Sequence, residues 1–139
     1  MKKGNRARSF VTIMIVIAVS ALLLRVAIER IIKINIAQNE SYACAALKSI
    51  SAALENYAKD HLGVFPANLS ILSQDNPPYL DKDYISEKPI KGYEYSCARL
   101  DTLGYSCSAS PLNCNLTGKM IYSVTTGGLI ISEDCSKKE

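Results

Sequence analysis

The chain lacks the residues on which several functional classes depend. Its 139 residues include no tryptophan and one histidine, His61, and no glycine or proline lies between Asn5 and Leu62. A single histidine at a predicted helix end provides no nucleophile–base pair, so we do not expect an enzyme. The stretch Thr-Thr-Gly-Gly at 125–128 lacks the lysine and the following helix of a phosphate-binding loop, and no cofactor is predicted.

Positive charge is concentrated at the N-terminus. The formal net charge is +3, and four of the 16 basic residues are Lys2, Lys3, Arg6 and Arg8. The other 12 stand against 13 acidic residues, so the rest of the chain is close to neutral. A nucleic-acid-binding domain carries its positive charge on the folded surface, so we expect no nucleic-acid binding by the head. The basic tip instead resembles the cytoplasmic flank of a membrane segment.

The stretch Phe10–Leu24 is uncharged, with Thr12 and Ser20 as polar interruptions. As a helix it covers about 22 Å, less than the hydrocarbon core of about 30 Å, so a span also uses the apolar residues beyond Arg25. It has three interpretations: a removed secretion signal, a retained membrane anchor, or the end of a subunit that leaves the membrane to join a fibre. The stretch directly after Leu24, RVAIERIIK, contains no small-x-small cleavage site followed by a turn, which disfavours the secretion signal.

Further along, apolar residues recur in steps of four and three, which predicts one face of an amphipathic helix. They are Ala43, Leu47, Ile50, Leu54 and Tyr57, and the opposite face is expected to carry Lys48, Ser51, Glu55, Asn56 and Lys59. Gly63 suits the left-handed position after a helix, and Pro66 cannot continue one. We predict one helix from about Phe10 to about His61; the alternative is an anchor, a break near Asn39 and a separate helix from Ser41.

From Gly92 the apolar period changes to two, which indicates strands at about 93–98, 104–109, 119–125 and 129–133. Gly127-Gly128 predicts a hairpin turn, and Asp101 to Gly104 another. The predicted fold is α+β, with one long N-terminal helix whose outer half packs on a small antiparallel sheet head. We divide the chain into a leader at 1–9, an apolar helix at 10–36 and a head at 37–139. Within the head, the helix ends near 62, a connector covers 63–91 and the sheet covers 92–135.

Four of the five cysteines lie in the C-terminal part of the chain: Cys97, Cys107, Cys114 and Cys135. They lack the close pairs of a zinc site, so no metal is predicted, and two disulfides in an oxidising compartment fit better. Three pairings are possible, and we favour Cys97–Cys107 across the first hairpin with Cys114–Cys135 closing the second. The alternative is a cytosolic protein with buried free thiols. Cys44 is left over and is expected to be buried.

A basic leader, a phenylalanine opening a long apolar helix and a disulfide-bearing sheet head together resemble type IV pilins and type II secretion pseudopilins. Residues 8–24, RSFVTIMIVIAVSALLL, are similar to the prepilin segment, and residues 63–80, GVFPANLSILSQDNPPYL, are similar to the region after the pseudopilin helix. The resemblance implies cleavage between Ser9 and Phe10 by prepilin peptidase and methylation of the new Phe10 amino group. The chain departs from the family at Ser9, where glycine is usual, and at Met14, where glutamate is usual.

The resemblance also implies a structural subunit of a type IV pilus or type II secretion filament. Its partners would be membrane lipid, other pilin or pseudopilin subunits, prepilin peptidase and an inner-membrane assembly platform. The chain would cross the bacterial inner membrane once, with its N-terminus cytoplasmic and its head periplasmic or extracellular. Met14 cannot make the family's charge contact with a neighbouring amino terminus, which favours a minor or tip subunit. The alternative is an uncleaved membrane-anchored binding module that holds a ligand through Tyr93, Tyr95, Tyr105 and Tyr122.

Overall fold

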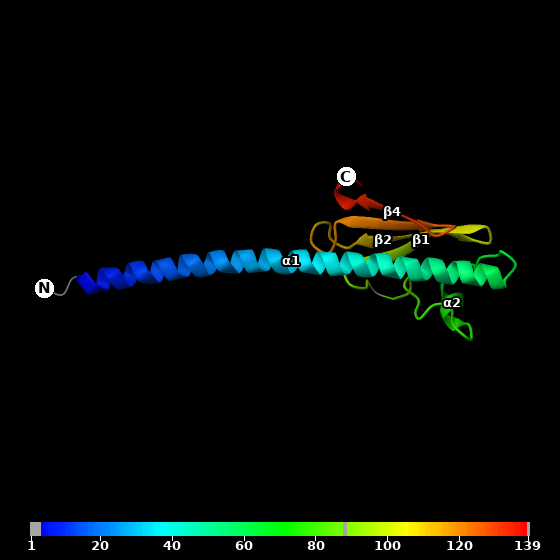
Figure 1. The fold of residues 1–139 in the computed structure, drawn as a ribbon, viewed down its shortest axis with the longest axis horizontal. Helices are drawn as coiled ribbons and strands as arrows, with labels where there is room; N and C mark the ends of the chain where they lie inside the picture. The colour runs from blue at the N-terminus through cyan, green and yellow to red at the C-terminus, as the bar shows by residue number, and fades with distance from the viewer. Residues whose placement is uncertain (1–3, 88, 139) are drawn as a thin grey trace. The chain divides into compact units, whose positions relative to one another are not determined.

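The computed structural model describes residues 4–87 and 89–138, so Lys2 and Lys3 of the predicted leader lie outside the described residues. Its elements are α1 (Gly4–Asp60), α2 (Ser70–Gln74), β1 (Tyr93–Asp101), β2 (Gly104–Pro111), β3 (Met120–Thr125), β4 (Leu129–Asp134) and the 3-10 helix η1 (Cys135–Lys138) (Figure 1). The chain divides into two compact units, one ending at Ile34 and one beginning at Asn35. The predicted α+β fold is confirmed.

Helix α1 is continuous through Asn39, so the alternative of a break there is wrong. The absence of glycine and proline from its interior explains this, because these residues are the usual helix breakers. The helix begins at Gly4 rather than near Phe10 and so includes part of the predicted leader. Arginine and alanine, which fill 6–8, are among the best helix formers.

The C-terminus of α1 uses two left-handed residues rather than one. Leu62 and Gly63 both have positive φ, 59° and 85°. The Gly63 N–H donates to the Ala58 carbonyl at 2.7 Å, the long backward bond of a Schellman ending. His61 also caps the helix, since its Nδ1–H donates to the Tyr57 carbonyl at 2.8 Å and its ring stacks on that of Tyr57.

The four strands form one antiparallel sheet in the order β1-β2-β3-β4. Each strand pairs with the next along the chain, and the observed bounds lie within three residues of those predicted. The β1–β2 register shifts between Cys97 and Arg99, which leaves Ala98 as an extra residue. The β3–β4 register is regular, and Gly127 and Gly128 adopt positive φ in its turn as predicted.

The core of the head lies between the outer part of α1 and one face of the sheet. The predicted helix stripe is confirmed, because Leu47 and Leu54 are fully buried together with Ala43 and Ile50, and Tyr57 is partly buried. The sheet contributes Tyr95, Tyr105, Cys107, Ala109 and Val124, and the connector contributes Leu72, Leu80 and Tyr84. The buried stripe is wider than predicted, since it also includes Ala46, Ala53 and the polar Ser51.

Candidate functional site

The N-terminal part of α1 presents an apolar surface that nothing in the described chain covers. Large apolar side chains from Phe10 to Ile34 are mostly between 50% and 66% exposed. The mean hydropathy of the most apolar window reaches 2.6, and no part of it is buried. This is a helix long and apolar enough to cross a membrane, and lipid or other apolar helices are the surroundings that such a surface favours.

Ser20 and the pair Arg25–Glu29 in this part of α1 have local partners. The Ser20 hydroxyl donates to the Val16 carbonyl at 2.7 Å, which satisfies it without help from water. Arg25 pairs with Glu29 one turn later, with 3.6 Å between Nε and Oε1. Both side chains are well exposed, so this pair contributes little stability in water.

The predicted processing residues lie in the same helix. Ser9 and Phe10 are helical and exposed, and Met14 follows Phe10 by four residues, which places both side chains on one face. Met14 is 55% exposed and apolar, and lipid accepts such a side chain. Cleavage at Ser9 and methylation of Phe10 stay predictions.

Two acidic groups of α1 hold the loops of the sheet onto the helix. Glu55 Oε1 accepts from the Tyr105 hydroxyl at 3.0 Å and from the Gly127 N–H at 2.8 Å. Glu40 Oε1 accepts from the Lys119 N–H at 2.8 Å, and Asn39 Nδ2 donates to the Thr117 carbonyl at 2.9 Å. These contacts fix both ends of the β3–β4 region along α1.

The prediction that Ser51 and Glu55 lie on the helix face opposite the apolar stripe is wrong. Ser51 is 6% exposed, and its hydroxyl lies 2.8 Å from the Tyr105 hydroxyl, while Glu55 is half-buried. On the helix both residues border the apolar stripe, where a tyrosine of β2, which the sequence pattern could not place, offers a polar group. Their spacing of four residues was the available signal, because it puts both side chains on one edge of the helix.

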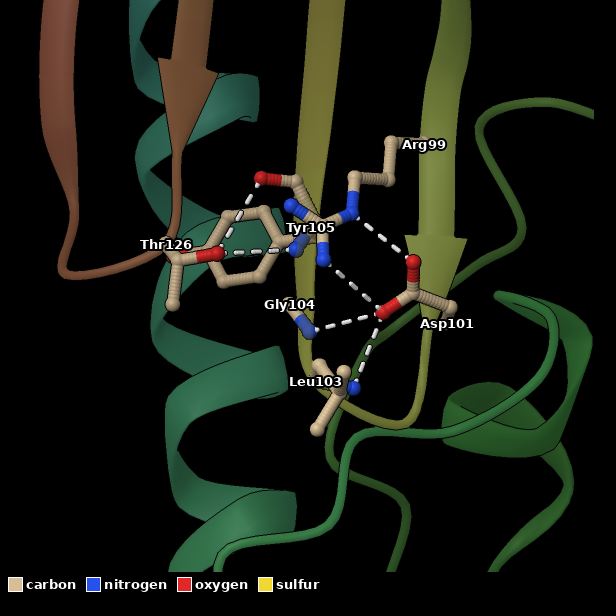
Figure 2. A network of polar contacts seen from close by, with 6 residues as sticks. All are labelled: Arg99, Asp101, Leu103, Gly104, Tyr105 and Thr126. Atoms are coloured by element: carbon tan, nitrogen blue, oxygen red, sulfur yellow. Dashed lines mark hydrogen bonds and ion pairs between the residues drawn. The ribbon is translucent and has the colours of Figure 1, made fainter.

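A second polar network closes the β1–β2 turn (Figure 2). Asp101 Oδ1 accepts from the Leu103 and Gly104 N–H groups at 2.9 and 3.0 Å, and Arg99 Nε donates to Asp101 Oδ2 at 2.8 Å. These bonds lower the pKa of Asp101, with the Arg99 hydrogen bond as the largest cause. The predicted turn at Asp101 to Gly104 is therefore confirmed. Thr126 links this end of the sheet to the β3–β4 turn, because its Oγ1 accepts from the Tyr105 N–H at 2.9 Å.

Both favoured disulfides are present. Cys97–Cys107 joins residues that are directly opposite in β1 and β2, and Cys114–Cys135 joins the loop before β3 to η1. Cys44 is the free cysteine of the described chain, and it is half-buried rather than buried as predicted. It lies beside Glu40, Ser41, Lys48 and Tyr122 at a shallow cleft along the head part of α1.

The strand tyrosines serve the core. Tyr93, Tyr95 and Tyr105 are at most 5% exposed, and Tyr122 is partly buried against the core. Burial raises the pKa of each of these hydroxyls. They do not form an open aromatic surface on which a ligand could stack.

The loop 81–87, which follows Pro77 and Pro78 and contains three acidic residues, is held by hydrogen bonds within the loop. Asp83 Oδ1 accepts from the N–H groups of Ile85 and Ser86, and the Ser86 hydroxyl donates to Asp83 Oδ2. Lys82 pairs with Glu87 at 3.8 Å and lies over the rings of Tyr42 and Tyr84. Among the described residues, no group of three or more acidic, histidine or cysteine side chains is placed to hold a metal ion.

Comparison of the chain with protein-family models, with curated proteins and with solved structures finds no match.

Proposed function

We propose that this protein is a pilin-like structural subunit, in a minor or tip position, of a type IV pilus or type II secretion filament. The observation that carries the proposal is the single unbroken helix Gly4–Asp60. The apolar side chains of its first half are exposed. Its second half packs on an antiparallel sheet and shares with it the core of a head that carries two disulfides. Such a helix suits a chain that is stored in a membrane and later packs its apolar half against other subunits.

The leader supports this proposal through its charge and position. Basic residues precede the apolar segment, which favours a cytoplasmic N-terminus and an exported head in a bacterial inner membrane. Two disulfides in the head agree with an oxidising compartment on the far side. The partners would be lipid, other pilin or pseudopilin subunits, the assembly platform and prepilin peptidase.

Met14 supports a specialised rather than a major position. A carboxylate at this position would be costly in lipid and would gain from pairing with a neighbouring amino terminus. Methionine has no such need and offers no such pairing, so this subunit would not fix the register of a repeated contact. A position at the tip, where that contact has no partner, fits the side chain.

The second candidate is an uncleaved membrane-anchored binding module. One observation favours it: a cleft between the start of α2 and the bulged part of β1, lined by Asn68, Ser70, Asp83 and Ala98 among others. Against it, the four tyrosines predicted to form its ligand surface are buried or partly buried.

The decisive experiment determines the N-terminus of the chain recovered from its native membranes, by intact mass and N-terminal peptide mass spectrometry. The proposal expects a chain beginning at Phe10 with one added methyl group. The matched variants are Ser9→Gly, which should be processed at least as well, and Ser9→Arg, which should remain full length. A wild-type chain that begins at Met1 or Lys2 in membranes where known prepilins are processed would overturn the filament mechanism and favour the anchored module.

A further inference from the structure

Strand β4 forms one edge of the sheet, and no described segment pairs with its outer side. The Cys135 N–H donates to the Lys119 carbonyl at 2.8 Å, which sets the alternation of this antiparallel pair. By that alternation, residues 129, 131 and 133 direct their backbone groups toward β3, and Ile130, Ser132 and Asp134 direct theirs toward the open edge. The open edge therefore offers three backbone N–H and three C=O groups.

The two edges of the sheet differ in protection. On β1, the extra residue at Ala98 interrupts the regular register, and Ile90 bridges to Tyr93. On β4, the register is regular from end to end, and the described strand carries no proline, lysine or bulge. Bulges, prolines and lysines are the usual devices that keep an edge strand from pairing with another chain. Their absence on β4 leaves one edge of this sheet open to a further strand.

The side chains of β4 define what the added strand would carry. Leu129 and Ile131 are 66% and 48% exposed on the face of the sheet turned away from α1, and Glu133 continues that row. Asp134 is occupied, because it accepts hydrogen bonds from the Ser136 backbone N–H and hydroxyl. Glu133 is the charged side chain that an incoming strand would meet on the face that carries Leu129 and Ile131. Complementary positions on that strand are two apolar residues and one basic residue.

Strand β4 is also held at both ends, which lowers the cost of ordering it on binding. At its start, Gly127 of the preceding turn donates its N–H to Glu55 of α1. At its end, the Cys114–Cys135 disulfide ties the next residue to the loop before β3. An edge fixed in this way needs little rearrangement to accept a partner.

We propose that the open edge of β4 is a docking site for an extended segment of another protein, paired antiparallel, with apolar residues opposite Leu129 and Ile131 and a basic residue opposite Glu133. This is recognition by strand addition, in which backbone bonds give affinity and alternate side chains give specificity. A second anchored copy does not fit. In the head, α1 runs lengthwise along the sheet (Figure 1). Antiparallel β4–β4 pairing would reverse the head part of α1 in the second copy, so Asn35, where the head begins, would lie at opposite ends of the two paired sheets.

The exclusion of a second copy rests on membrane anchoring, but the docking edge itself does not depend on the filament function.

An antiparallel partner of β4 would begin beside Asp134, where η1 follows. A test strand can therefore be attached to the C-terminus of the full-length chain. We would append a short Gly/Ser linker and the strand Lys-Thr-Val-Thr-Val-Thr after Glu139. Lysine then lies opposite Glu133, and the two valines lie opposite Ile131 and Leu129. Attachment gives an effective concentration of about 1 mM, enough to populate a weak pairing.

The measurement is backbone hydrogen exchange of the full chain in detergent micelles. The proposal expects the Ile130 and Ser132 amides to exchange at least tenfold more slowly in the extended chain than in the wild type. Proline in place of the threonines, which removes the donors facing β4, should abolish the protection, and glutamate in place of lysine should weaken it. Equal protection by the proline-containing strand, or none by the original strand, would overturn the proposal.

A variant in β4 itself provides the second arm. In Ser132→Pro, the N–H that faces the open edge is lost and the ladder to β3 is kept, so protection of Ile130 by the appended strand should disappear. Should this variant fail to fold, Ile131→Lys removes the apolar contact instead, with Leu103→Lys in the β1–β2 turn as its matched control. Undiminished protection in Ile131→Lys would contradict strand docking. None of these readouts depends on where the N-terminus begins, so failure here is separate from failure of the filament proposal.

Discussion

Glu55 provides the sharpest test of how the head is attached to α1. In Glu55→Ala, the Tyr105 hydroxyl loses a charged acceptor at 3.0 Å and the Gly127 N–H loses one at 2.8 Å. A hydrogen bond to a charged group contributes about 1.5–3 kcal/mol. Tyr105 is 2% exposed but keeps Ser51 as a partner, and the Gly127 N–H lies at an exposed turn where water replaces the acceptor. We therefore expect a loss of about 1.5–2.5 kcal/mol in the free energy of unfolding.

The assay is urea unfolding of the full chain in detergent micelles, followed by near-ultraviolet circular dichroism of the tyrosines. Glu55→Gln keeps an acceptor oxygen and should lose about half as much, because only the charge is removed. A double-mutant cycle with Tyr105→Phe should give a coupling energy of about 1 kcal/mol. Glu94→Ala, at an exposed position of β1, is the control and should change stability by less than about 0.5 kcal/mol. Equal effects of Glu55→Ala and Glu94→Ala, with no coupling to Tyr105, would refute this account.

Three further predictions concern the head. Leu62→Gly should raise the free energy of unfolding by about 1 kcal/mol, because leucine is strained at φ 59° and its side chain, 99% exposed, loses no contact. Gly63→Ala should lower the free energy of unfolding, because alanine is strained at the positive φ of that position. A destabilised Leu62→Gly variant would contradict backbone strain at Leu62. Replacing Cys114 and Cys135 together by serine should cost about 2–4 kcal/mol, and an unchanged urea midpoint would show that the disulfide is dispensable. The hydrogen bond to Asp60 raises the pKa of Tyr79 from 10.0 to about 12. Because the pKa of Tyr79 is higher in the folded than in the unfolded chain, the hydrogen bond to Asp60 stabilises the fold fully below pH 10. This stabilisation is lost as the pH rises from 10 to about 12. An ultraviolet titration of Tyr79→Phe should lack that step.

The sequence predicts the fold well where periodicity is strong. Steps of three and four identify the buried stripe from Ala43 to Leu54, and a period of two identifies all four strands. Turn residues with a special backbone, Gly127 and Gly128, locate the last hairpin. The favoured disulfide pairing is confirmed, and Cys97 and Cys107 lie on either side of one predicted turn. These features depend on residues that are near one another in the chain, so they can be predicted from short segments of the sequence.

Features that depend on distant partners were not accessible in the same way. Whether Ser51 faces solvent depends on Tyr105, which lies 54 residues away and supplies its hydroxyl partner. The left-handed conformation of Leu62 is another example, since leucine disfavours it and the adjacent Gly63 was the expected choice. The open edge of β4 was missed because strand order, rather than strand existence, decides which strands lie at an edge.

Under the proposed function, two features bear on what would draw the chain out of the membrane: Met14, at the position where pilins usually carry glutamate, and the open edge of β4. At the centre of a membrane helix, an acidic side chain costs roughly 2.5–3.5 kcal/mol on insertion scales, whereas apolar side chains are favourable. A glutamate in lipid gains when a neighbour neutralises its charge, but Met14 gains nothing comparable. Under the proposed function, its incorporation must therefore be driven by other contacts. The apolar surface from Phe10 to Ile34 contributes packing alone, which lipid also provides. The head must then supply the difference, and a strand bound at β4 is a contact that the membrane cannot replace.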